Sequence, residues 1–210
     1  MGIFQYFAMS RAICARIRIG EDRCSLGRLL VQILFALVIS GVAAGEEVGA
    51  VNPNRVEAAF LRNFAHYVDW PADAFADARS PWRVCVAGRD PFGEVLEKTL
   101  NNRTEQGRPF SIYRGDSPEK LPFCHILFIA FDDPDERRAV LGELKDKPVL
   151  TVGTNADFLG EGGIIRFRVN NRVHMSINLD QARAVSLKIQ TKMLEVADQV
   201  IENGTVHTLR

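Results

Sequence analysis

Acidic and basic side chains balance in this chain of 210 residues, with 26 of each and a formal net charge of zero at pH 7. A protein that binds nucleic acid usually carries an excess of Lys and Arg, so this balance excludes nucleic acid as the expected partner. The length suits one domain of ordinary size once the amino-terminal segment is set aside.

That segment has the pattern of an export signal. Five arginines precede an apolar run at residues 29–44, LLVQILFALVISGVAA, which ends in small residues. This order is typical of a secretory signal cleaved near Ala44. An uncleaved membrane anchor is the alternative, but sixteen residues are fewer than the roughly 20 that span a bilayer. We therefore expect residues 1–44 to be a signal peptide with a long n-region and residues 45–210 to be a single exported domain.

Residues 53–152 alternate helical and extended patterns. Asn52 and Pro53 fit the N-cap and first position of a helix that ends before Trp70. The run CHILFIAF at 124–131 has the nearly continuous apolar character of a central strand covered on both faces. In chain order, we expect a helix from Pro53 to before Trp70, a strand over 82–87, a helix over about 90–100, strands over 107–114 and 124–131, a helix over 137–144, and a strand over 149–152.

A hairpin is expected next. Apolar residues alternate with polar ones over 165–169 and again over 173–177, and the pair Asn170 and Asn171 between them tolerates the positive φ of a tight turn. Asn178, three residues before Gln181, resembles a capping box. The apolar residues that follow recur at helical spacing and predict a long amphipathic helix that ends near Gly204: Ala182, Val185, Ile189, Met193, Val196 and Val200.

Together these elements predict an α/β fold. Its mixed, mostly parallel sheet is flanked by helices and carries a carboxy-terminal β-hairpin followed by a long amphipathic helix.

The sequence offers no recognisable catalytic or metal-binding motif. The four histidines lie far apart and form neither HxxxH nor HExxH, and no GxSxG elbow is present. Gly160, Gly162 and Gly163 follow a polar stretch and precede a strand, which is the wrong context for a dinucleotide-binding loop. We therefore expect neither an enzyme nor a bound metal or cofactor.

The outward face of the hairpin is the candidate partner- or ligand-binding site. Arg166, Arg168, His174 and Ser176 project together if the two strands pair, and Lys188 on the following helix would extend this surface. The alternative is a charged sheet edge that only discourages strand addition.

Export also bears on the cysteines. Cys14 and Cys24 fall in the signal peptide, so the exported chain keeps Cys85 and Cys124. We expect these two residues to form a disulfide, since both lie on strands of one sheet and the compartment is oxidising. Two separate buried thiols are the alternative.

Several segments together resemble the YfiR-like family: AFLRNFAHYVDWP at 59–71, VCVAGRDPFG at 84–93, GRPFSIYR at 107–114, CHILFIA at 124–130, VLTVG at 149–153 and GGIIRFRVNNRVHMSINLDQARAVSLKIQTKMLEVA at 162–197. The resemblance implies a periplasmic α/β protein that keeps the family's cysteine pair at Cys85 and Cys124. One departure concerns the second hairpin strand, where His174, Met175 and Ser176 replace the family's Arg, Phe and Glu.

The resemblance implies a non-catalytic regulator that binds the periplasmic part of a membrane diguanylate cyclase and inhibits or modulates it, within cyclic-di-GMP signalling and biofilm control. It adds an outer-membrane OmpA-like lipoprotein as a further partner, and a homodimer is left open. The competing hypothesis is a periplasmic small-ligand sensor that feeds a histidine kinase or another membrane receptor, with an anion held by Arg166, Arg168 and His174.

Overall fold

A computed structural model describes residues 52–170 and 172–209. The signal peptide expected over residues 1–44 lies outside the described residues, so it stays a prediction.

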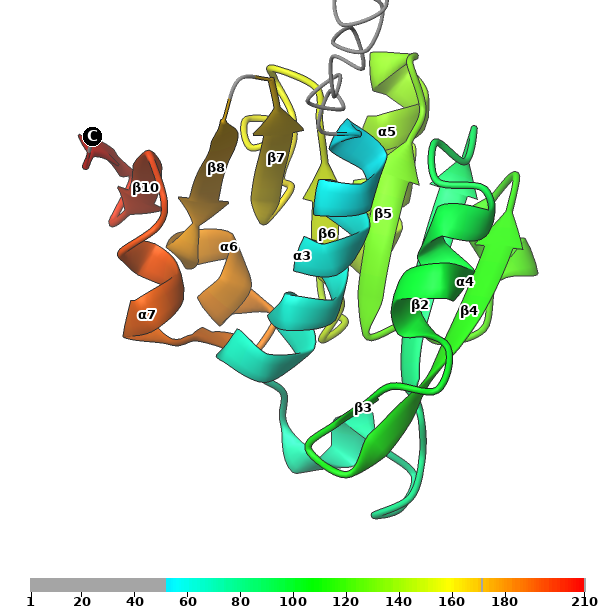
Figure 1. Ribbon diagram of the computed structural model, residues 1–210. Helices are drawn as coiled ribbons and strands as arrows, with labels where there is room; N and C mark the ends of the chain where they lie inside the picture. The colour runs from blue at the N-terminus through cyan, green and yellow to red at the C-terminus, as the bar shows by residue number, and fades with distance from the viewer. Residues whose placement is uncertain (1–51, 171, 210) are drawn as a thin grey trace, which may run out of the picture. The chain divides into compact units, whose positions relative to one another are not determined.

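The domain is an α/β fold built on one sheet of nine strands, in the order β11-β10-β8-β7-β6-β5-β2-β4-β3 (Figure 1). Strands β4, β2, β5, β6 and β7 run parallel, whereas β3, β8 and β11 are antiparallel to β4, β7 and β10. The nine strands are β2 (Trp82–Gly88), β3 (Thr104–Glu105), β4 (Arg108–Gly115), β5 (Ile126–Ala130), β6 (Leu150–Gly153), β7 (Ile165–Val169), β8 (Val173–Asn178), β10 (Gln199–Glu202) and β11 (Thr205–Thr208). The mixed, mostly parallel sheet predicted from the sequence is confirmed.

Helices cover both faces of this sheet. They are α3 (Pro53–Tyr67), α4 (Glu94–Leu100), α5 (Pro134–Leu144), α6 (Leu179–Ala184) and α7 (Thr191–Leu194). Asn52 caps α3 through its side chain, which accepts a hydrogen bond from the Asn54 N–H at 3.0 Å. None of the helices within the described residues has the length and apolar character needed to cross a bilayer.

The alternating side chains of β2 divide the core into two layers. Val84 and Val86 belong to the cluster that includes α3 and α4, whereas Cys85 and Ala87 belong to the cluster that includes α5. Phe167 of β7 packs in the first layer, with its ring centroid 4.6 Å from that of Phe60. The fold therefore buries one face of the hairpin under α3 and directs the other face toward the α5 side.

The disulfide lies in the second layer. Cys85 and Cys124 are bonded and almost fully buried, which confirms the predicted pair. Because β2 and β5 are neighbours in the sheet, the bond fastens β2 to the segment that enters β5.

The prediction of a long amphipathic helix after the hairpin is wrong. Helix α6 ends at Ala184, and Ser186 has a φ of 61°, a left-handed conformation that an α-helix cannot contain. The next residues form β9 (Lys188–Ile189), which pairs antiparallel with β1 (Val68–Asp69) at the end of α3. The apolar residues of the expected stripe are still buried apart from Val196, but four short elements bury them in place of one helix.

Gly204 has a different role from the helix stop that the sequence suggested. Asn203 and Gly204 have φ values of 52° and 70° and form the turn between β10 and β11. Two consecutive residues with positive φ define the type I′ turn that Asn-Gly favours in hairpins. The Asp180 carboxylate accepts hydrogen bonds from both turn N–H groups, at 2.8 Å each, and these bonds lower the pKa of Asp180.

Candidate functional site

The hairpin forms with the predicted register. Arg166 lies opposite Ser176 and Arg168 lies opposite His174, so the structure brings these four residues together on one face. Phe167 and Met175 point the other way, into the core under α3. The period-two pattern thus placed the polar residues on the correct side of the sheet.

Arg166 and Ser176 are largely engaged within the protein. Arg166 donates from Nη1 to the Ala156 carbonyl oxygen at 3.0 Å and from Nη2 to the Ser176 hydroxyl oxygen at 3.2 Å. Ser176 is only 3% exposed. Ser176 lies on the predicted face but is not accessible there, because Arg166 and the loop that leads into β7 close over this end of the hairpin. These two residues tie that loop to the sheet.

His174 is bound by a carboxylate from another segment. Its Nδ1 lies 3.0 Å from Oδ2 of Asp198, and Arg172 contacts the same carboxylate at 3.6 Å. Asp198 is held in place because its N–H donates to the Met175 carbonyl oxygen at 2.7 Å. The second hairpin strand has no carboxylate of its own, so Asp198 supplies the negative charge on this surface. No local pattern in the sequence predicts this contact.

Arg168 is an exposed cation on β7, and within residues 52–170 and 172–209 its guanidinium has no ion-pair or hydrogen-bond partner. Lys188 is also exposed but lies elsewhere. It belongs to β9, opposite Asp69 in the two-stranded sheet, and does not extend the hairpin face. The accessible charge of the predicted site is therefore concentrated in Arg168, beside the partly exposed pair of His174 and Asp198.

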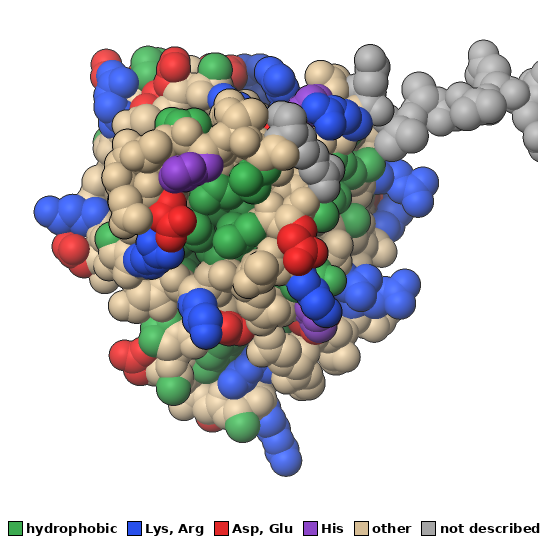
Figure 2. All heavy atoms as spheres, turned by 90° about the vertical axis from the view of Figure 1, so that its left-hand side faces the viewer, with side chains coloured by type: hydrophobic (Ala, Val, Ile, Leu, Met, Phe, Trp, Pro, Cys, Tyr) green, Lys and Arg blue, Asp and Glu red, His purple; other side chains and the backbone are tan. Residues whose placement is uncertain are grey.

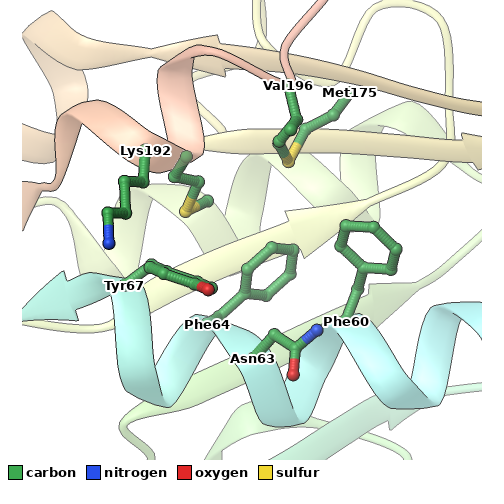
Figure 3. A pocket seen from close by; sticks show the side chains of 8 residues that line it. Phe60, Asn63, Phe64, Tyr67, Met175, Lys192 and Val196 are labelled. Carbon is green, nitrogen blue, oxygen red and sulfur yellow. The ribbon is translucent and has the colours of Figure 1, made fainter.

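A second surface, which the sequence did not suggest, is a groove between α3 and the segment around α7. Figure 2 looks from the side on which α7 and β10 lie and shows hydrophobic side chains at the floor of a hollow, with charged side chains around it. The groove has a volume of about 220 Å³. It is lined by Phe60, Asn63, Phe64, Tyr67, Met175, Lys192, Met193 and Val196 (Figure 3).

Burial shifts the pKa of two further groups. Desolvation lowers the pKa of His125 to about 4, and the ring is bonded as a neutral imidazole: Nδ1 accepts from the Arg83 N–H at 3.0 Å and Nε2 lies 3.0 Å from the Ala74 carbonyl oxygen. Desolvation also raises the pKa of Glu57, on the buried face of α3, to about 7. Among the described residues, no group of three or more His, Cys, Asp or Glu side chains is arranged to hold a metal ion.

Both surfaces lie within one family match. The model of the YfiR/HmsC-like family matches residues 54–198, which is more than half of the chain. The chain belongs to the YfiR/HmsC-like family. A search of curated proteins found no match.

The extent of the YfiR/HmsC-like match is informative about the site. It begins in the first turn of α3 and ends at Asp198, so it includes the hairpin, the carboxylate bound to His174 and every residue of the groove. Strands β10 and β11 lie beyond it and complete the sheet at its β8 edge.

Proposed function

We propose that this member of the YfiR/HmsC-like family is a periplasmic, non-catalytic regulator that binds the periplasmic part of a membrane diguanylate cyclase and inhibits or modulates it. The match over residues 54–198 is the observation that carries the proposal, because it spans the whole sheet up to β10 in one continuous segment. An outer-membrane OmpA-like lipoprotein would be the partner that withdraws the regulator from the cyclase.

The disulfide supports the proposed periplasmic location. Disulfides persist in the periplasm and are rare in the cytosol, where thiols are kept reduced. Cys85 and Cys124 are bonded inside the core.

The hairpin supports a protein contact at Arg168. This guanidinium is exposed, and the neighbouring Arg166 is already used within the domain. An exposed cation at the rim of an interface mainly increases the rate of association with an acidic partner and adds salt dependence.

Two measurements test the proposal. Deletion of the gene should raise cyclic-di-GMP in the host if the regulator inhibits its cyclase, and an unchanged level would contradict the proposed function. The variant Arg168→Glu should weaken binding to the periplasmic part of the cyclase by about tenfold at low salt. Lys188→Glu is the matched control, since it reverses an exposed charge on the other sheet and should leave binding unchanged. If Arg168→Glu and Lys188→Glu bound the periplasmic part of the cyclase with equal affinity, the proposed contact at the hairpin would be contradicted.

A further inference from the structure

The groove between α3 and α7 combines an apolar floor with polar groups that the protein leaves unused. Its floor is formed by the rings of Phe60 and Phe64 and by Met175 and Met193, and Val196 stands at its rim with 45% of its surface exposed. An apolar hollow with a few polar groups converging on it is the usual form of a small-ligand site.

Three polar side chains share this groove: Lys192, Tyr67 and Asn63. Across the described part of the chain, the Lys192 ammonium makes no ion pair, and neither the Tyr67 hydroxyl nor the Asn63 amide has a hydrogen-bond partner. All three can donate hydrogen bonds, and one carries a full positive charge. Figure 3 shows Lys192 and Tyr67 at one end of the groove and Phe60, Met175 and Val196 at the other.

The polar end and the apolar end of the groove each favour a different chemical group of a ligand. A carboxylate fits the end with Lys192 and Tyr67, and an apolar body fits the end with Phe60 and Met175, where aromatic rings and thioethers make favourable contacts. The volume of about 220 Å³ is below the 300–1,000 Å³ of typical ligand pockets. It equals about seven water molecules at ~30 Å³ each, so the ligand has on the order of ten non-hydrogen atoms.

We propose that the groove between α3 and α7 binds a small monocarboxylate with an apolar body, held by Lys192 at its charged end. This site is separate from the hairpin face, and the proposal does not depend on the cyclase as partner. A regulator with such a site would respond to an amphipathic acid in its compartment.

The methionines give a direct readout. The sequence has four, of which Met175 and Met193 line the groove and Met1 and Met9 belong to the expected signal peptide. Protein labelled with ¹³C at its methionine methyl groups can be titrated with 3-phenylpropanoate and, separately, with its neutral amide of the same shape. We expect the Met175 and Met193 signals to shift saturably with the acid, with a Kd on the order of 0.1–1 mM, and the amide to bind about fivefold more weakly.

The variant Lys192→Gln should abolish the preference for the acid while leaving the binding of the amide unchanged. Lys188→Gln is the control: it removes an exposed charge outside the groove and should keep the preference. Unmoved Met175 and Met193 signals at about 10 mM acid would overturn the proposal. Equal affinities for acid and amide in the unaltered protein, or a persistent preference in Lys192→Gln, would overturn the role of Lys192 and with it the ligand class.

Discussion

Removal of the disulfide should strongly destabilise the core layer that faces α5. Cys85 and Cys124 are 39 residues apart in the chain. For a closed loop of that length, the chain-entropy relation gives about 4 kcal/mol of stabilisation, because the cross-link restricts the unfolded ensemble. Domains of this size have a free energy of unfolding of only about 5–15 kcal/mol. The double variant Cys85→Ala/Cys124→Ala should therefore lose a large part of its stability.

Urea unfolding of the exported protein, followed by tryptophan fluorescence, measures this loss. We expect a decrease of about 4 kcal/mol and a melting temperature lower by about 8–16 °C. Removal of two buried sulfur atoms adds a small packing loss. The double variant Cys14→Ala/Cys24→Ala is the control, because both cysteines lie in the expected signal peptide and the mature protein should be unaltered. A loss below about 1 kcal/mol in the first variant would refute the loop-closure argument.

The buried side chains of Glu57 and His125 should make the free energy of unfolding depend on pH in opposite directions. Glu57 stays protonated in the native protein up to about pH 7, whereas it ionises near 4.5 when unfolded, so the free energy of unfolding falls as the pH rises from 4.5 through 7. Glu57→Gln should therefore raise the free energy of unfolding at pH 8 by about 1–3 kcal/mol, with little change at pH 4. A destabilised Glu57→Gln protein at pH 8 would show that the carboxylate is stabilised. His125 takes up a proton near pH 6.5 when unfolded but only near 4 when native, so stability falls as the pH falls from 6.5 to 4, by up to about 1.4 kcal/mol per pH unit. His125→Asn should flatten that slope in urea titrations, and an unchanged slope would assign it to other groups.

Local sequence patterns predicted the strands whose side chains alternate between a buried face and a polar face. The period-two alternation over 165–169 and 173–177 was sufficient to place Arg168 opposite His174, because one face of that hairpin is buried under α3 and the register cannot slip without exposing Phe167. Cys85 and Cys124 were likewise predictable once export left them as a pair. Export itself remains a prediction.

The segment after the hairpin was not predictable from its spacing. Apolar residues at intervals of three and four fit a helix, but here the same residues are buried by short turns and strands. The positive φ of Ser186 and the pairing of Ile189 with Val68 are tertiary effects that override local propensity. The Asn-Gly pair at 203–204 was a hairpin signal, and the helical interpretation concealed it.

The groove was missed for the same reason. Met193 and Val196 were assigned to the buried stripe of a long helix, and nothing in the sequence places Lys192 beside Tyr67. Such a site becomes visible only when the carboxy-terminal segment returns to α3. In contrast, the burial of Ser176 depends on the loop before β7, whose path has no periodic pattern.

The pairing of β1 with β9 also affects how the domain can fold. The Gln190 side chain donates to the Asp69 carboxylate across 121 residues of chain, and Val68 lies opposite Ile189. A nascent chain lacks these contacts until residues 188–190 have been synthesised, so α3 has no complete packing surface until then. Contacts of such large sequence separation slow folding, because the loop must close before they contribute. Under the proposed export, this delay would help the chain to cross the membrane unfolded, because the domain cannot complete its native structure before residues 188–190 have been made.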